Sequence, residues 1–331
     1  MFSSPIPDTL FHTQLIVLRD TLPSVFDGQP NGIHDARIAT RRIRELLPLL
    51  SSARHHWRLD DLDARFRRLG RSLGRVRDAD VRVGLLESLE RRIPHAAPAL
   101  VLVRQQRERR RLQLMRKLIK RLERLDTVEL VSALLRGGRV RSPWPLSPSD
   151  RKWRRVLRTT LASRAAAALS AIERASGVYF PNRIHAARIA IKKLRYAMEI
   201  AHDAEGHDSA DSIRGLKKAQ DILGDLHDRQ ELIDDFCVAS SPESTSPSND
   251  DVQVALVRQV VEAEARHLHS RYLQRRERLI GICRAPSYAP ASSTLPLPSL
   301  LAVGTLALSS GVVIAQRLAS SSHGADHGRH E

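Results

Sequence analysis

The chain has 331 residues, of which 42% are hydrophobic and only 4% aromatic, a composition that suits packed helices and argues against a β-sandwich. Its 54 Lys and Arg outnumber 37 Asp and Glu, for a formal net charge of +17, which favours a polyanionic partner such as nucleic acid, an anionic membrane or polyphosphate. The two cysteines, Cys237 and Cys283, form no CxxC pair and are interpreted as small hydrophobic residues in a reducing cytosol. The N-terminus lacks the basic and apolar regions of a signal peptide.

Helical periodicity predicts five helices in each half of the chain, and no segment alternates as strands do. In the first half the predicted helices span 8–22, 31–51, 58–77, 79–92 and 97–135. In the second half they span 150–176, 182–204, 208–225, 227–239 and 252–283. Residues 137–149 are rich in Gly, Pro and Ser and predict a linker, so the two halves are 8–136 and 150–284.

One unusual sequence occurs twice. The chain reads HDARIATRRIR from His34 and HAARIAIKKLR from His185, with one histidine and four cations at the same spacing. Two later segments also repeat: LGRVRD from Leu73 returns as LGDLHD from Leu223, and LVRQ from Leu102 returns from Leu256. The offset stays between 150 and 154 residues, which predicts a tandem duplication.

Each copy of the repeated sequence forms two faces when it is placed on a helix. The cationic face of the first copy carries His34, Arg37, Arg41 and Arg44, and that of the second carries His185, Arg188, Lys192 and Arg195. Small and aliphatic residues lie on the opposite face: Ala36, Ala39, Ile43, Leu46 and Leu47 in the first copy, and Ala187, Ala190, Leu194 and Ala197 in the second. Like charges four residues apart repel, whereas Arg binds phosphate through two parallel hydrogen bonds and Lys acts as a point charge. A row without interleaved acids therefore predicts an anion site.

The segments that follow add further cations, more of them in the first half. Asp221 and Asp225 stand where the first copy has Arg71 and Arg75, which predicts asymmetric binding. Gly74 and Gly224 are interpreted as helix C-caps or points of close backbone approach. The aspartates that follow each of them, Asp78 and Asp228, are interpreted as N-caps or salt-bridge anchors.

The duplicated H-x-x-R-x-x-x-[RK]-[RK]-[IL]-R pattern, each copy followed by L-G-x-[LV]-x-D, resembles the CHAD family, the conserved histidine α-helical domain, over residues 8–284. The resemblance implies an all-α fold of two four-helix bundles with pseudo-two-fold symmetry and a basic central groove. It also implies that the protein binds inorganic polyphosphate and lies at polyphosphate granules. The predicted polyphosphate-binding residues are His34, Arg37, Arg41, Arg42, Arg44, Arg67, Arg68, Arg71, Arg75, Arg104, His185, Arg188, Lys192, Lys193, Arg195, Arg214, Lys217, Lys218 and Arg258.

The leading functional hypothesis is therefore a non-enzymatic polyphosphate-binding module with no cofactor, no metal site and no catalytic residue. Binding to nucleic acid is an alternative that the net charge permits, although aromatic residues for base stacking are few. A third alternative is a phosphohydrolase or phosphotransferase that uses His34 or His185. No carboxylate cluster for Mg²⁺ and no glycine-rich phosphate loop accompanies these histidines in the sequence.

Residues 285–331 differ in composition from the rest of the chain. Residues 285–316 carry no charged side chain, and a polar, histidine-containing tail starts near Ser320. The stretch 297–316 has the length of a membrane span but is diluted by Pro, Gly and Ser. It is open to three interpretations: a tail anchor, a helix docked on the domain, or a hydrophobic patch for self-association or for a granule surface. In each case we expect the basic domain in the cytoplasm.

Overall fold

The structure is a computed structural model that describes residues 6–51, 57–124, 126–137, 150–177, 179–206, 209–239 and 249–285. Within these ranges every regular element is helical and none is a strand. This confirms the predicted all-α class. All of the described residues belong to one compact unit, and residues 290–331 lie outside the described ranges.

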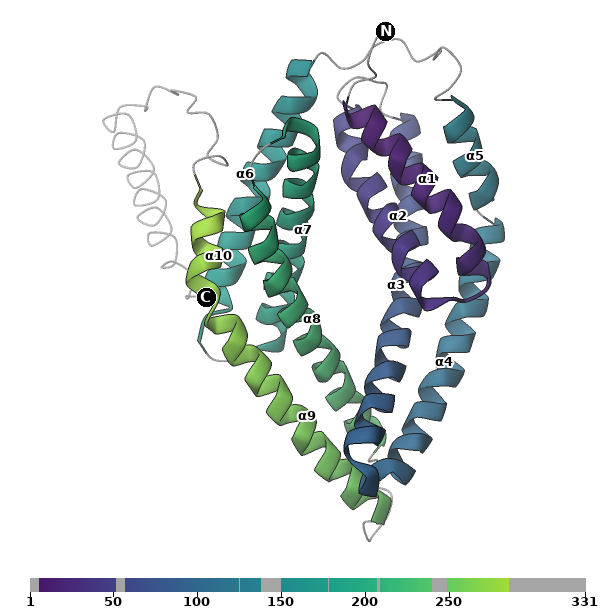
Figure 1. The fold of residues 1–331 in the computed structure, drawn as a ribbon, viewed down its shortest axis with the longest axis vertical. Coiled ribbons are helices and arrows are strands. Elements are labelled where there is room, and N and C mark those ends of the chain that lie inside the picture. The colour runs from purple at the N-terminus through teal and green to yellow at the C-terminus, as the bar shows by residue number, and fades with distance from the viewer. Residues whose placement is uncertain are drawn as a thin grey trace, which may run out of the picture. The chain divides into compact units, whose positions relative to one another are not determined.

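Ten α-helices and one short 3₁₀ helix make up the described part of the chain (Figure 1). The first half contains α1 (Ile6–Phe26), α2 (Pro30–Ser51), α3 (Trp57–Arg92), η1 (Pro94–Ala96), α4 (Ala97–Arg124) and α5 (Thr127–Gly137). The second half contains α6 (Asp150–Arg174), α7 (Pro181–Glu205), α8 (Ala210–Ala239), α9 (Asn249–Leu273) and α10 (Arg276–Cys283). Each half thus has four long helices and a short fifth one, where the resemblance implied four.

Several predicted helix boundaries are wrong. Helix α3 runs through the predicted break at residue 78, and α8 runs through the break at residue 226. Gly74 and Asp78 therefore lie inside a helix and cap nothing, and the same holds for Gly224 and Asp228. Conversely, the predicted helix 97–135 is divided at Asp126, whose φ of 42° is left-handed, a conformation that Asp tolerates better than most residues. The predicted helix 252–283 is divided by a turn at residues 274–275.

The two helices that carry the repeated sequence, α2 and α7, begin alike. Pro30 and Pro181 are their first residues, where a missing N–H costs nothing and the fixed φ suits a helix. Helix α7 ends at Gly206, whose φ of 67° provides a left-handed C-cap. The predicted inward faces are confirmed: Ala36 and Ile43 of α2 and Leu194 of α7 are fully buried. The opposite faces are left for the cations.

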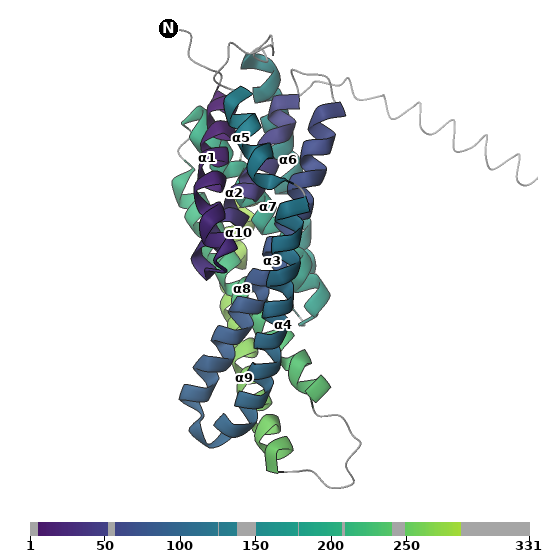
Figure 2. The same cartoon turned by 90° about the vertical axis from the view of Figure 1, so that its right-hand side faces the viewer.

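Three hydrophobic clusters hold the unit together. The first contains residues of all five helices from α1 through α5. The second contains residues of all five helices from α6 through α10 and also takes in Leu46 and Leu49 of α2. The third lies where α3, α4, α8 and α9 meet, around Leu86, Leu100 and Phe236. Figures 1 and 2 show these four helices together at the lower end of the described chain. The two halves are therefore packed against each other at two separate places.

The two cysteines lie in different environments. Cys283 is buried in the hydrophobic core, whereas Cys237 is exposed. Burial raises the pKa of the Cys283 thiol to about 11.

No helix in the described ranges is long and apolar enough to cross a membrane. The stretch 297–316 lies outside those ranges, so its three interpretations stay predictions.

Helices α1 and α2 are in close contact at Gly32. A Cβ atom at this position would lie 2.5 Å from the Cβ of Ser24 and 3.0 Å from its backbone carbon. Gly32→Ala should therefore lower the free energy of unfolding by about 1–3 kcal/mol, the cost of overpacking, despite the better helix propensity of Ala. Chemical denaturation measures the change.

Gly84→Ala is the matched control for this variant. Gly84 lies in α3, and a Cβ there would meet nothing within 4 Å. The control should be stabilised by up to about 1 kcal/mol, because Ala favours a helix over Gly. Equal effects of the two substitutions would contradict the close approach of α1 and α2.

Candidate anion-binding site

The structure brings the two repeated sequences together. Helix α2 supplies three cationic or titratable side chains and α7 supplies three more. Lys192 of α7 interacts electrostatically with Arg37 and Arg41 of α2, so the two predicted cationic faces meet across the two halves of the chain. We call this set the central cluster; it consists of His34, Arg37, Arg41, His185, Arg188 and Lys192.

The central cluster is short of negative charge. Burial and then the charges of Arg188, Arg37 and Arg41 lower the pKa of Lys192 to about 8. Burial also lowers the pKa of Arg41 to about 10, and Arg37 and Arg195 add to the effect. Such shifts mean that the charged forms are disfavoured in the unliganded protein. A bound polyanion would remove that penalty.

Three histidines lie at the central cluster and are biased toward the neutral form. Desolvation and then Arg77 lower the pKa of His34, while desolvation, Arg188 and Lys192 lower that of His185. His227 of α8 joins them, with its ring centroid 5.2 Å from that of His185. Burial lowers the pKa of His227 to about 4. All three can gain a proton when an anion arrives.

Two carboxylates lie among these cations. Asp78 of α3 is 3.8 Å from the Nη1 of Arg37 and also interacts with Lys192 and His227. Burial raises the pKa of Asp228, whose carboxyl group lies near Arg188. The prediction of a salt-bridge anchor is thus confirmed for Asp78. These acids offset only part of the positive charge.

An aromatic side chain that was not predicted joins α2 to α7. Tyr196 is 3% exposed, and two guanidinium groups contact its ring. The Cζ of Arg41 is 3.9 Å from its ring centroid and that of Arg195 is 4.5 Å from it. The buried Nε of Arg41 has no hydrogen-bond partner among the described residues. Tyr196 therefore fixes the position of Arg41 from across the boundary between the two halves.

Two substitutions of Tyr196 should distinguish the contribution of its ring to binding from that of its hydroxyl group. The hydroxyl group has no hydrogen-bond partner in the described structure, so Tyr196→Phe should bind polyanions like the wild type. Tyr196→Leu removes the cation–π contacts, which are worth about 0.5–2 kcal/mol, and should weaken binding about tenfold. Polyphosphate titration measures both, with circular dichroism as a check on folding. Equal loss in both variants would contradict the role of the ring.

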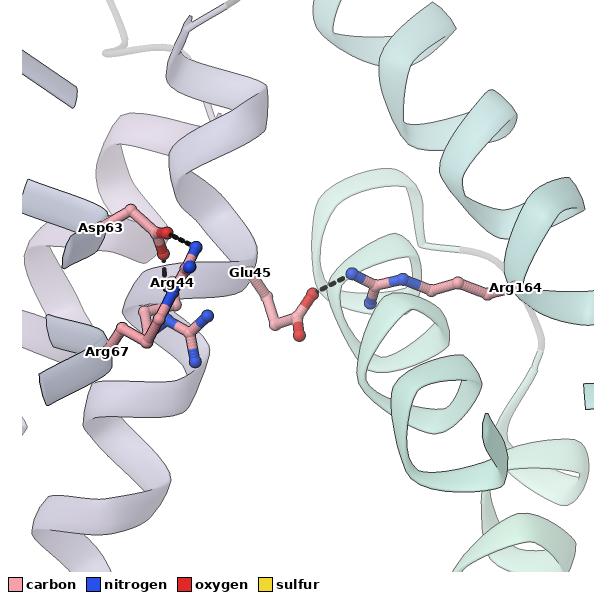
Figure 3. Close-up of polar contacts among 5 residues, drawn as sticks. All are labelled: Arg44, Glu45, Asp63, Arg67 and Arg164. Atoms are coloured by element: carbon pink, nitrogen blue, oxygen red, sulfur yellow. Dashed lines mark hydrogen bonds and ion pairs between the residues drawn. The ribbon is translucent and has the colours of Figure 1, made fainter. Parts of the chain in front are cut away.

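Some predicted residues are neutralised by acids instead. Arg44 and Arg67 both contact Asp63, Arg44 through its Nε at 2.9 Å (Figure 3). Figure 3 also shows Glu45 reaching across to Arg164 of α6. Arg44 is thus paired with a carboxylate of α3, although helical geometry predicted it in an unopposed cationic row. These contacts join α2 to α3 and to α6.

Further predicted residues also contact acidic side chains. Arg42 lies 3.6 Å from Glu199, which also pairs with Arg195. Three others are paired as well: Arg104 with Glu90 at 2.7 Å, Arg214 with Asp211 at 3.1 Å, and Arg258 with Glu262 at 3.3 Å. The predicted cations that are exposed and have no carboxylate within 4.0 Å in the described ranges are Arg68, Arg71, Arg75, Lys193, Lys217 and Lys218. None of the 19 assignments to polyphosphate binding is tested by these positions, and they stay predictions.

This geometry defines a class of protein: an all-α domain in which two helices with the repeated histidine and arginine residues face each other. The model of the CHAD domain matches residues 9–234, more than half of the chain, so the chain belongs to the CHAD domain family. The predicted resemblance is confirmed. The match ends within α8, and the extension of the domain to residue 284 stays a prediction.

Solved structures agree with this assignment. The chain resembles PptA from Streptomyces chartreusis with a TM-score of 0.59 and 16% identity, over 82% of this chain and 98% of that one. It also resembles the CHAD domain from the plant Ricinus communis with a TM-score of 0.55 and 21% identity, over 83% and 92%. At these identities the likeness concerns the fold. No curated protein matches the chain.

Proposed function

We propose that the protein binds inorganic polyphosphate through the central cluster and does not turn it over. The observation that carries this proposal is the meeting of six cationic or titratable side chains from α2 and α7, with Lys192 held at a pKa of about 8. A polyphosphate chain offers one negative charge or more per unit and no base to recognise. It would relieve the repulsion and release its own counterions.

The salt dependence of binding tests this proposal. By analogy with single-stranded nucleic acid, the logarithm of the affinity should fall linearly with the logarithm of salt concentration, with a slope of about −0.7 per contacted phosphate. The double variant Arg37→Gln and Arg188→Gln should make that slope shallower. Long-chain polyphosphate should also displace DNA at a much lower phosphate concentration than the reverse. Displacement in the opposite order would favour the nucleic-acid alternative.

We infer that the domain is a tandem duplication with pseudo-two-fold symmetry. The order of helix contacts supports this inference. In the first half α1 packs on α2, α2 on α3, α3 on α4, and α5 returns to α1. In the second half α6 packs on α7, α7 on α8, α8 on α9, and α10 returns to α6. Each half thus builds its bundle in the same sequence of contacts.

The absence of turnover and the place in the cell are parts of the same proposal. Purified protein incubated with long-chain polyphosphate should release no orthophosphate, and release that is lost on His34→Ala or His185→Ala would overturn the non-catalytic assignment. In cells we expect the protein in the cytoplasm at polyphosphate granules. A fluorescent fusion should leave the granules when the central cluster is neutralised.

A further inference from the structure

A cavity of about 380 Å³ lies beside the central cluster, between α3 and α4. Its volume falls in the range of about 300–1,000 Å³ that is typical of small-molecule sites. Four arginines line it: Arg75 and Arg82 from α3, and Arg107 and Arg110 from α4. None of the six members of the central cluster lines it. It is therefore a separate recess with its own cations.

Two of the four arginines are held in place by acids. Arg82 contacts Glu231, and the Nη2 of Arg107 is 2.9 Å from the Oδ1 of Asp235. Both acids belong to α8 in the other half of the chain. These pairs join the walls of the cavity to α8.

The other two arginines are unpaired. Neither Arg75 nor Arg110 has a carboxylate within 4.0 Å in the described part of the chain. The Nη1 of Arg110 donates a long, weak hydrogen bond of 3.4 Å to the Oε1 of Gln113. Both are exposed. Two guanidinium groups that line one recess repel each other, and each has donor pairs suited to phosphate oxygens.

Asp78 connects this cavity with the central cluster. Asp78 is one of the lining residues of the cavity, and its carboxylate is 3.8 Å from Arg37. The remaining lining residues, Ala79 and Leu114, are apolar, and no aromatic side chain is part of the lining. The recess therefore offers cations for phosphate and no surface on which a nucleobase would stack.

We propose that this cavity is a subsite for a short inorganic oligophosphate of about three linked phosphates. Arg75 and Arg110 bind the anion, while Arg82 and Arg107 hold the walls and add to the positive potential. The proposal deepens the proposed polyphosphate function but does not depend on the central cluster. It predicts that short chains bind at a place other than the one that holds the long polymer.

Titration of the full-length protein with inorganic tripolyphosphate tests the subsite. The double variant Arg75→Ala and Arg110→Ala should weaken tripolyphosphate binding at least tenfold. The matched control is Arg91→Ala with Arg109→Ala, which removes one exposed arginine from α3 and one from α4 outside the cavity. The control should bind within threefold of the wild type. Equal losses in the two double variants, or no measurable binding by the wild type, would overturn the proposal.

A variant of the central cluster separates this proposal from the proposed function. Arg37→Gln with Arg188→Gln should weaken binding of long-chain polyphosphate and leave tripolyphosphate binding within threefold. Loss of both ligands in this variant would place tripolyphosphate in the central cluster and overturn the subsite. If the wild type binds tripolyphosphate through Arg75 and Arg110 but does not bind the long polymer, the proposed function fails and the subsite stands.

ATP distinguishes an inorganic chain from a nucleotide as the source of the phosphates. Because the cavity has no aromatic side chain, ATP should bind no more tightly than tripolyphosphate. Tenfold tighter binding of ATP that is lost in the Arg75→Ala and Arg110→Ala variant would show recognition of the nucleoside and overturn the assignment to inorganic oligophosphate.

Discussion

Reversing the charge at four positions of the central cluster should abolish polyphosphate binding. The variant carries Arg37→Glu, Arg41→Glu, Arg188→Glu and Lys192→Glu. Each hydrogen bond to a charged group contributes about 1.5–3 kcal/mol, so the loss of four should reduce the affinity by at least about 10³-fold. Repulsion of the polymer by the new carboxylates adds to the effect. Filter binding or calorimetry at fixed salt measures the affinity, and circular dichroism measures the helix content, which we expect to be unchanged.

A second fourfold variant controls for net charge. Arg109, Arg116, Lys117 and Arg121 are exposed residues of α4, and their replacement by Glu changes the net charge of the chain by the same amount. We expect this control to lose less than about tenfold in affinity, since charges beyond a Debye length are largely screened. Wild-type binding by a folded variant of the central cluster would refute the assignment of the site. If that variant fails to fold, Arg37→Gln with Arg188→Gln asks the same question at half-exposed positions.

Affinity for polyphosphate should fall as the pH rises from 6.5 to 9.5. Lys192 has a pKa of about 8 in the unliganded protein, because it is buried and faces Arg188 of α7 and Arg37 and Arg41 of α2, with Asp78 of α3 as the acid. A bound polyanion raises that pKa, so binding takes up a proton above pH 8. At pH 9.5 about 3% of the free protein carries the proton, and linkage predicts a loss of about 30-fold.

The conservative variant Lys192→Arg isolates this effect. A guanidinium group stays charged throughout this range, so the affinity of the variant should be nearly constant between pH 7.5 and 9.5. Calorimetry in buffers of different ionisation enthalpy should also show proton uptake by the wild type and little by the variant. A wild-type affinity that is flat in pH, or an unchanged pH profile in the variant, would contradict the role of Lys192.

A further gain in affinity is expected on the acidic side. His34, His185 and His227 all have lowered pKa values in the unliganded protein, so they are largely neutral near pH 7 and can each accept a proton when phosphate oxygens approach. The sign is the same as for Lys192: lower pH favours the bound state.

Local sequence sufficed for the helices and for the buried faces of α2 and α7, because these depend on residue spacing alone. It failed at two kinds of boundary. Gly74 and Asp78 look like a helix end, yet α3 continues through them because Leu73 and Ala79 on either side are buried. The sequence around Asp126 contains no Gly or Pro that would predict a turn, yet Asp126 takes the left-handed conformation that divides α4 from α5. Packing against other helices decides both cases.

The part of the site that could be predicted from the sequence is the part formed by the two repeated sequences. The histidine and the cations at the fourth and eighth positions of each copy meet in the central cluster, whereas Arg44 pairs with Asp63. Which cations keep their charge unopposed depends on where distant acids lie, and periodicity does not encode that. Tyr196 directly follows the repeated sequence and is one of only 4 tyrosines, a signal that could have suggested a contact with Arg. The cavity arginines come from two helices whose pairing only the fold reveals.

The ring centroid of Tyr196 lies 3.9 Å from the Cζ of Arg41 on α2 and 4.5 Å from that of Arg195 on α7. The rows of positive charge on α2 and α7 therefore come within one ring of each other. A thin, supple strand of phosphates could engage both rows at once. A double helix is far broader and stiffer and would contact fewer of these cations at a time. Molecular width, rather than charge, would then discriminate between two polymers that are equally anionic.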